Sequence, residues 1–363
     1  MFGTAHATRS RMNSLGQNQN QGSFYFDDNR NDFRNPANVG KIRNFMVAEL
    51  EALEVSQSNL EGGFFGEFNS DLAFGVYLGK ESVILDTIAK AAAAGSLSIG
   101  SFPTSEDANP LNLFLGGGSD FKWGLNVNYA NSNAEMGTYD NTYSNIGAGL
   151  GIETKGGLQA YLNYIISNES KLGSPNASYS KLKNTGMQLG LIYPINSDYT
   201  IWGQYGGTVV KASPNATNTE IKLEGQDIIV GLGRIFELSP TSRFNFDLSF
   251  NMAEGEDTAA KGKKISKMTL PLVIGFEGSA TDWLTLRGSI EQGFILNNYK
   301  IENKGSTTTT EPKKVSGTKI ALGAGLQFGK LKIDGNLGGV GSNTKNSLIS
   351  SDFFVNAAAT FMY

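Results

Sequence analysis

Cysteine is absent from the 363 residues of the chain, and His6 is the sole histidine. The lack of cysteine excludes disulfides and thiolate ligands; it suits export through an oxidising space, although many cytosolic chains also lack cysteine. A Ser-His-Asp triad or a histidine-based metal site would have to use His6, which lies in a polar N-terminal stretch. The sequence therefore predicts no catalytic residues, no metal site and no cofactor.

Charge is scarce as well. Asp, Glu, Lys and Arg make up 18% of the chain, below the roughly 25% typical of soluble proteins. The longest apolar runs fall well short of the ~20 residues that a helix needs to cross a bilayer, which excludes a transmembrane helix. The formal net charge is -4 and no dense basic block is present, so a nucleic-acid partner is not expected.

Residues 1–40 form a polar segment rich in Asn, Gln, Arg and Asp, without strand-like alternation. Residues 1–10 lack the apolar core of a secretory signal, although Ala5-His6-Ala7 looks like a cleavage signature. We therefore interpret Met1 as a start residue placed before a mature chain. The predicted organisation is an N-terminal periplasmic or lumen-plugging segment (residues 1–40) followed by one β domain (residues 41–363).

Strands of alternating polarity fill that β domain. In RFNFDLSFNM (residues 243–252), the even positions carry Phe, Phe, Leu, Phe and Met, and the odd positions carry Arg, Asn, Asp, Ser and Asn. Successive side chains of an extended chain point to opposite faces, so one face is apolar and the other polar. We count about sixteen candidate strands, separated by Gly, Asn, Asp, Ser or Thr.

Short and long connections take turns along the chain. The short ones lie at residues 69–70, 117–120, 155–157, 195–198, 238–242, 278–282 and 329–330, and the long ones near 55–59, 81–109, 131–142, 167–183, 212–219, 253–266, 296–317 and 342–350. An up-and-down antiparallel barrel in an outer membrane shows this order, because one rim is trimmed to turns and the other carries loops. A sandwich with Greek-key crossings does not.

The size of such a barrel decides which face is wet. Eight strands already enclose all the space that side chains can fill. With about sixteen strands, an apolar interior would be a void, whereas a polar interior can hold water while the apolar faces meet lipid. The sequence therefore predicts an all-β fold: a transmembrane up-and-down antiparallel barrel of about sixteen strands. Two packed soluble sheets, in a β-rich binding module, are the alternative.

One long connection differs from the others. Residues 81–96 read ESVILDTIAKAAAAGS and have helical propensity, with Gly95 as a plausible helix end. We expect a short helix in this extracellular loop, either folded toward the pore or packed between subunits, or a small cap on the rim. The candidate constriction or interface residues are Glu81, Asp86 and Lys90.

The last residues, SDFFVNAAATFMY, alternate in polarity and stop on an aromatic residue. This stretch resembles the terminal strand of Gram-negative outer-membrane barrels, and residues 41–363 resemble Gram-negative porins in strand count and topology. The N-terminal run RSRMNSLGQNQNQGSFYFDDNRNDFRNPANV is similar to porin-like outer-membrane proteins of predatory bacteria. That resemblance implies a ring-shaped homo-oligomer, such as a trimer or pentamer, that encloses membrane lipid in the outer membrane of a Gram-negative bacterium.

Two functions follow. The first is a homo-oligomeric porin whose polar lumen passes small hydrophilic solutes, with mixed lumen charges and weak selectivity. The second is a structural envelope protein whose lumen is plugged by residues 1–40 and whose oligomer organises lipid. The predicted pore-lining residues are Glu49, Glu51, Lys122, Asn126, Asn128, Arg243, Asp247, Arg287, Glu291, Lys332 and Asp334, and the predicted lipid-facing or subunit-interface residues are Phe244, Phe246, Phe250, Ala357, Ala359 and Phe361.

Overall fold

The computed structural model describes most of the chain. The described residues are 8–41, 43–54, 57–80, 82, 110–136, 139–173, 180–213, 221–257, 263–295, 300–303, 309–310, 318–340 and 353–363. Three short helices come first, α1 (Arg9–Ser14), η1 (Asn29–Phe33) and η2 (Pro36–Gly40). The strands are β1 (Phe45–Glu54), β2 (Gln57–Asn69), β3 (Leu72–Leu78), β4 (Leu111–Gly117), β5 (Phe121–Met136), β6 (Tyr139–Thr154), β7 (Gln159–Gly173), β8 (Ser180–Pro194), β9 (Tyr199–Ser213), β10 (Ile221–Ser239), β11 (Ser242–Asp257), β12 (Lys263–Ser279), β13 (Leu284–Ile295), β14 (Lys300–Asn303), β15 (Thr309–Thr310), β16 (Thr318–Phe328), β17 (Leu331–Val340) and β18 (Phe353–Met362).

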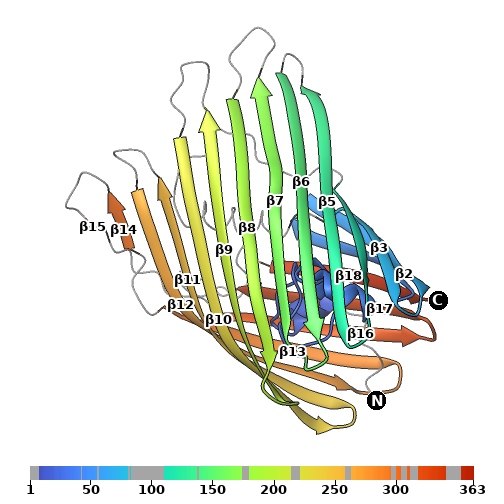
Figure 1. Ribbon diagram of the computed structural model, residues 1–363. Coiled ribbons are helices and arrows are strands. Elements are labelled where there is room, and N and C mark those ends of the chain that lie inside the picture. The colour runs from blue at the N-terminus through green and yellow to red at the C-terminus, as the bar shows by residue number, and fades with distance from the viewer. Residues whose placement is uncertain are drawn as a thin grey trace.

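The strands form one closed antiparallel sheet (Figure 1). Consecutive strands pair with each other, and β1 pairs with both β2 and β18, so the ring closes without an edge. The short β14 and β15 extend from the loop end of β12, while β13 pairs directly with β16. Sixteen strands therefore make the wall, and the predicted up-and-down barrel is confirmed.

Several strands run further into the long connections than the sequence predicts. Only residues 55–56 separate β1 from β2, and only residues 137–138 separate β5 from β6. The alternation stops before these strand ends because nothing requires apolar outward side chains once a strand has left the hydrocarbon layer. The predicted helix at residues 81–96 lies outside the described residues, apart from Ser82.

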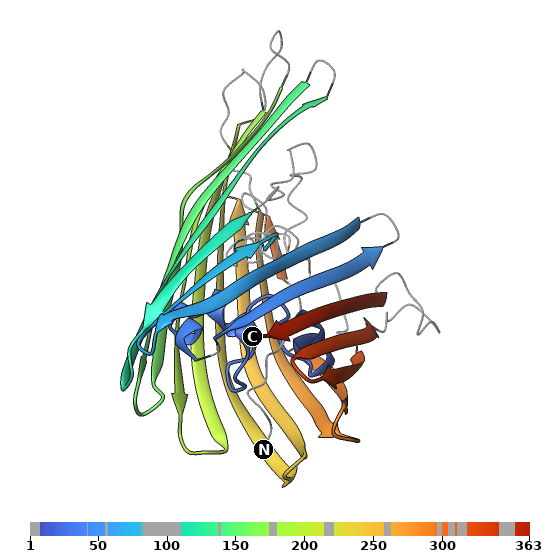
Figure 2. The same ribbon diagram turned by 90° about the vertical axis from the view of Figure 1, so that its right-hand side faces the viewer.

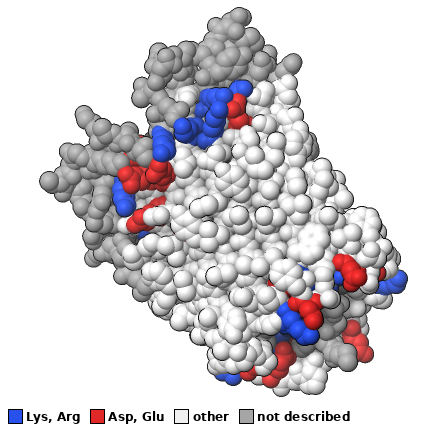
Figure 3. Space-filling view, viewed as in Figure 1, with Lys and Arg blue, Asp and Glu red and all other residues white. Residues whose placement is uncertain are grey.

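The outer wall carries the apolar faces of the strands. On β11, Phe244 is 41% exposed on the outside, whereas Asn245 and Asp247 are 1% and 8% exposed on the inside. Figure 3 shows the result on one side of the barrel, a broad band without charged residues between two groups of charges. Among the described residues, no helix has the length and apolarity to cross a membrane.

The tight turns lie together at the lower rim in Figure 1, and the strand ends that lead into the other connections lie at the opposite rim. At one turn, Asn69 Oδ1 accepts hydrogen bonds from the backbone amides of Asp71 and Leu72, both at 2.9 Å. An even-stranded antiparallel barrel with an apolar outer band, short turns on one side and longer loops on the other is the architecture of outer-membrane proteins. The chain is an outer-membrane barrel, as its sequence predicts.

Candidate functional site in the barrel lumen

The N-terminal segment lies inside the barrel. In Figures 1 and 2 its helices are surrounded by the strands in both views. Of residues 8–41, only Asn18 and Asp27 are exposed. Helix α1 packs on β13 and β16 to β18, and η2 packs on β3 to β6. The polar inner face of the barrel therefore meets polypeptide at this level. We call residues 8–41 the lumen segment.

Capping side chains shape the lumen segment locally. Thr8 Oγ1 accepts from the amide of Arg11 at 3.2 Å, and Asp28 Oδ1 accepts from the amide of Arg30 at 2.7 Å. Asn35 caps η2 in the same way, with Pro36 in the first turn. Isolated helices this short are not stable in water. Contacts with the barrel wall must therefore hold the segment in its fold.

The first of these contacts is an ion cluster around Glu277 of β12. Arg11 of the lumen segment donates to both of its carboxylate oxygens, at 2.8 and 3.0 Å. Arg243 of β11 and Arg287 of β13 donate to the same carboxylate, at 2.6 and 2.7 Å respectively. Arg287 also donates to Asp334 of β17 at 2.7 Å. A bidentate arginine–carboxylate pair away from water fixes both position and orientation, so this cluster anchors α1.

A second cluster joins the lumen segment to β1 and β2. Glu49 and Glu61 are directly opposite each other in the strand register, an arrangement that destabilises a sheet unless cations compensate. Arg30 Nη1 lies 2.6 Å from Glu61 and 3.5 Å from Glu49. Arg9 forms an ion pair with Glu61 at 2.9 Å and donates its backbone amide to Glu49 at 2.9 Å. Two arginines of the lumen segment therefore neutralise two carboxylates of the wall.

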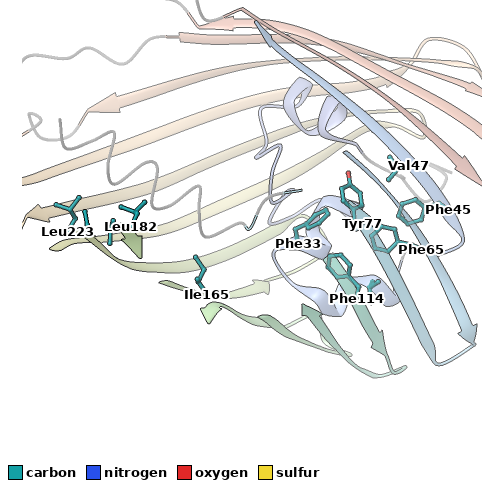
Figure 4. Close-up of a cluster of buried hydrophobic side chains, with 12 residues drawn as sticks. Phe33, Phe45, Val47, Phe65, Tyr77, Phe114, Ile165, Leu182 and Leu223 are labelled. Atoms are coloured by element: carbon teal, nitrogen blue, oxygen red, sulfur yellow. The ribbon is translucent and has the colours of Figure 1, made fainter. Parts of the chain in front are cut away.

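Aromatic side chains complete the contact. Phe33 meets Tyr77 and Phe114 edge-on, with ring centroids 4.9 and 5.4 Å apart; Figure 4 shows these rings beside Phe45 and Phe65. On another part of the wall, Phe24 stacks on Trp202 of β9, with ring centroids 5.0 Å apart. Offset and edge-to-face ring pairs add stability beyond the area they bury. The lumen segment is thus packed as a core against several sectors of the barrel.

The lumen segment also forms hydrogen bonds with β7, β8 and β11 of the barrel wall. Tyr25 Oη and Gln17 Nε2 donate to Asp247, at 2.9 and 3.0 Å. Asn163 of β7 donates to the carbonyl oxygen of Arg34 at 2.9 Å, and Gln188 of β8 donates to Gln21 at 3.2 Å.

Two acidic groups of the lumen segment are buried at a cost. Both carboxylate oxygens of Asp32 are buried without a hydrogen-bond partner among the described residues. Burial, together with the charge of Asp28, raises the pKa of Asp32 well above its usual range. Burial raises the pKa of Asp28 to about 7, although the neighbouring Arg11 acts in the opposite direction. Both carboxyls therefore bind protons more tightly in the docked segment than in water.

We expect docking of the lumen segment to weaken as pH rises. A raised folded-state pKa contributes stability below the ordinary carboxyl pKa, and this contribution is lost as pH climbs through the folded value. Hydrogen-exchange protection of the lumen-segment amides should therefore fall between pH 5 and pH 8. Asp32→Asn should flatten this pH dependence. The matched control is Asp27→Asn, because the Asp27 side chain is 77% exposed. Equal pH profiles for wild type and Asp32→Asn would contradict the assignment.

An asparagine ladder runs across the inner wall. Side-chain amides donate to the side-chain oxygen of the asparagine on the preceding strand; three of these contacts are Asn128 to Asn112 at 3.2 Å, Asn168 to Asn145 at 3.1 Å and Asn184 to Asn168 at 2.8 Å. The first member, Asn112, donates to the backbone carbonyl of Lys80 at 2.8 Å. Asn145 also donates to Asn128, which joins β4 to β8 in one chain of amides. All five side chains are buried.

An apolar patch also lies on the inner face, closer to the loop ends of β8 to β10. Leu182, Val210, Ala212 and Leu223 are buried there, and the register places Val210 opposite Leu223 and Ala212 opposite Leu182. Figure 4 shows Leu182 and Leu223 close together and apart from the aromatic group around Phe33. The inner wall therefore presents apolar side chains as well as amides.

The structure places the sequence-predicted lumen residues on the inner face wherever it describes their side chains. Glu49, Asp247, Arg287 and Asp334 contact the lumen segment or lie in its ion clusters. Lys122 pairs with Glu153 at 3.1 Å, and Asn126 donates to the carbonyl oxygen of Leu113 at 3.3 Å. Arg243, Asn128, Glu291 and Lys332 are also buried or half-buried on this face, whereas the side chain of Glu51 is outside the described residues.

The other predicted site residues are those expected to face lipid or another subunit and those expected in the long loop. Phe244, Ala357, Ala359 and Phe361 are exposed on the outer wall, and Phe246 and Phe250 share the outward face of β11 with Phe244. The loop residues Glu81, Asp86 and Lys90 lie outside the described part of the chain.

Glu61, Glu277 and the arginines of the lumen segment that bind them are absent from the residues predicted from the sequence. Glu61 and Glu277 occupy inward positions of β2 and β12, next to the outward Leu60 and Phe276. Alternation could have placed both carboxylates inside. The four buried arginines of the lumen segment are a second signal, because a polar segment with Arg9, Arg11, Arg30 and Arg34 needs acidic partners once it is enclosed.

Comparison with known proteins gives distant likenesses. No family model matches the chain, and no curated protein matches it. Among solved structures, the monoaromatic hydrocarbon channel CymD is 12% identical over 100% of this chain and 99% of its own, with a TM-score of 0.44. The toluene transporter TodX of Pseudomonas putida is 10% identical over 98% and 97%, at 0.42. The toluene transporter TbuX of Ralstonia pickettii is 12% identical over 100% of both chains, also at 0.42.

Proposed function

We propose that the protein is an outer-membrane channel for small solutes that is closed at rest by its lumen segment. The observation that carries the proposal is the anchoring of residues 8–41 to the inner wall through the clusters at Glu277 and at Glu49 and Glu61. A sixteen-stranded wall without such a segment leaves an aqueous channel. Passage then requires the lumen segment to move. This gated channel refines the passive polar pore that the sequence predicts.

Two features of the inner wall support candidate solute classes. The asparagine ladder offers amide donors and acceptors, which supports the expected passage of small hydrophilic solutes. The apolar patch at Leu182, Val210, Ala212 and Leu223 favours a second candidate, small solutes with an apolar body. Sites that bind such molecules are mostly apolar with a few placed polar groups, and the two features together meet that description.

A reducible tether tests whether the lumen segment gates the channel. An ideal Cβ on Gly16 would lie 3.3 Å from Cβ of Ser289 on β13, close to the ~3.8 Å separation of a disulfide. Gly16 has a φ of +70°, and its added Cβ would also lie 2.5 Å from Cγ1 of Val273. Gly16→Cys therefore carries about 1–3 kcal/mol of backbone strain and requires Val273 to shift. The chain has no other cysteine.

Proteoliposomes of the Gly16→Cys, Ser289→Cys protein should exclude solutes when oxidised and admit them after reduction. Swelling assays with a small sugar and uptake assays with a small aromatic compound would separate the two solute classes. The single variant Ser289→Cys is the control and should not respond to reductant. Equal flux in the oxidised and reduced tethered protein would refute gating by the lumen segment.

The finer predictions from resemblance are also proposals. These are a ring-shaped homo-oligomer that encloses lipid and a relationship with the porin-like outer-membrane proteins of predatory bacteria. A structural role with a lumen plugged by residues 1–40 is the alternative to the gated channel. Ala357 and Ala359 on the outer face of β18 would allow close approach of a neighbouring barrel. Bulky substitutions at these alanines should break an oligomer in native gels if they lie at its contact.

A further inference from the structure

A row of lysines crosses the outer wall at its loop-side border. Lys183 of β8 is directly opposite Lys211 of β9, and Lys211 is directly opposite Lys222 of β10. Lys171 of β7 and Lys181 of β8 face each other one step nearer the loops. Figure 3 shows basic residues gathered at the upper border of the uncharged band. We call these five residues the lysine row.

Among the described residues of this patch, the lysines outnumber the carboxylates. Glu169 forms ion pairs with Lys171, Lys181 and Lys183, at 2.8, 3.0 and 3.5 Å. Glu224 pairs with Lys222. Five ammonium groups therefore face two carboxylates among the described residues of this patch. Like charges directly opposite in a sheet are destabilising, and a polyanion bound across the row would offset that repulsion.

The position of the lysine row relative to the membrane indicates which kind of anion it can bind. Between Lys211 and the turn-side end of β9, the outward residues are all uncharged and face lipid: Val209, Gly207, Tyr205, Gly203 and Ile201. Lysines at the end of such a run reach the headgroup layer with their ammonium groups. In outer-membrane barrels the longer loops are extracellular, so the lysine row lies at the headgroups of the outer leaflet.

A hollow adjoins the row on its membrane side. It has a volume of about 440 Å³ and is lined by outward-facing residues that include Tyr164, Met187, Tyr205 and Val209. The ring of Tyr205 lies over Gly207, where an added Cβ would be 3.0 Å from Tyr205 Oη. The opposite end carries Glu224, Glu254 and Glu256 together with Lys264, which pairs with Glu254 at 3.5 Å, so carboxylates outnumber cations there. On β8 and β9, apolar surface thus lies on the membrane side of the lysine ammonium groups. On β10 and β11, the carboxylates disfavour binding of an anion.

We propose that this part of the outer wall is a binding site for a phosphorylated lipid of the outer leaflet. The phosphate groups bind Lys183 and Lys211, and the adjoining chains occupy the apolar side of the hollow. Each basic residue near an anionic membrane surface contributes about 1 kcal/mol, which is roughly a fivefold change in affinity. The site depends only on the membrane embedding of the barrel and not on the movement of the lumen segment.

Native mass spectrometry of the full chain in detergent, titrated with diphosphoryl lipid A and with its dephosphorylated form, tests the proposal. Wild type should retain the phosphorylated lipid and bind the dephosphorylated lipid much more weakly. Lys183→Gln with Lys211→Gln should lower the affinity for the phosphorylated lipid about twentyfold. The control is Lys155→Gln with Lys330→Gln at the turn-side rim, which should leave the affinity unchanged.

Three results would overturn the site. They are equal binding of both lipid forms by wild type, an unchanged affinity in the Lys183, Lys211 variant, and an equal loss in the turn-side control. Competition by millimolar inorganic phosphate separates the sources of the anion. A lipid site should retain its ligand, whereas displacement at that concentration would indicate a site for free phosphate and reject the lipid.

Discussion

Removal of residues 1–41 is expected to turn a closed barrel into a steadily conducting one. In a planar bilayer, the full chain should give a closed baseline with at most brief openings. The truncated chain should conduct at a level higher by on the order of tenfold or more, because sixteen strands enclose a water-filled channel. The physical reason is that the lumen segment packs on β3 to β6 and on β13 and β16 to β18.

The open lumen should also prefer cations. Glu49 and Glu61 lose Arg9 and Arg30 when the segment is removed, and Glu277 loses Arg11. Rings of carboxylates favour cations in a pore. The reversal potential in a salt gradient measures this preference, and the oxidised Gly16→Cys, Ser289→Cys protein is the closed control. A full chain that already conducts steadily would reject the closed resting state, whereas a silent truncated chain would favour the structural role.

Glu277→Gln should have the largest effect of any single substitution in the lumen. Glu277 accepts from Arg11, Arg243 and Arg287 in one buried cluster. Removing one partner of a buried ion pair leaves uncompensated charge and costs about 3–5 kcal/mol. We expect the variant to lose hydrogen-exchange protection in α1 and to unfold at lower urea concentration in detergent.

Two further substitutions, one at the surface and one compensating, test whether loss of the buried ion cluster causes the loss of stability. Glu67→Gln removes a carboxylate that is 42% exposed and pairs with Arg43 at 3.4 Å, so it should change stability by about 0–1 kcal/mol. Glu277→Gln combined with Arg11→Met should regain part of the loss, because it removes one of the unpaired cations. If Glu277→Gln lowers stability no more than Glu67→Gln does, the ion cluster does not anchor the lumen segment.

Much of the wall could be predicted from the sequence, and for a simple physical reason. In a membrane barrel each strand residue faces either lipid or lumen, so a two-residue period identifies the strand and its faces. RFNFDLSFNM shows this, with Phe244 outside and Asn245 inside. Outside the hydrocarbon layer the constraint ends, and the predicted loop near residues 55–59 proved to be strand on both sides of residues 55–56.

The state of the lumen could not be predicted in the same way. Alternation says that Glu49, Asp247 and Asp334 point inward, but it does not say whether they meet water or protein. The decisive contacts join residues far apart in the sequence, such as Arg11 with Glu277 and Thr8 with Asp334. No local pattern encodes these pairs, because they exist only after the ring has closed around the lumen segment.

The sequence by itself thus determined the all-β class, the strand count, the outward apolar faces and the absence of membrane-spanning helices, since each follows from local periodicity or composition. The tertiary structure alone decided the register that sets Glu49 opposite Glu61, the enclosure of residues 8–41, and the side-by-side lysines of β8, β9 and β10. The physical reason is that periodicity reports which face a side chain takes, whereas its neighbours on that face depend on register and closure across the whole chain.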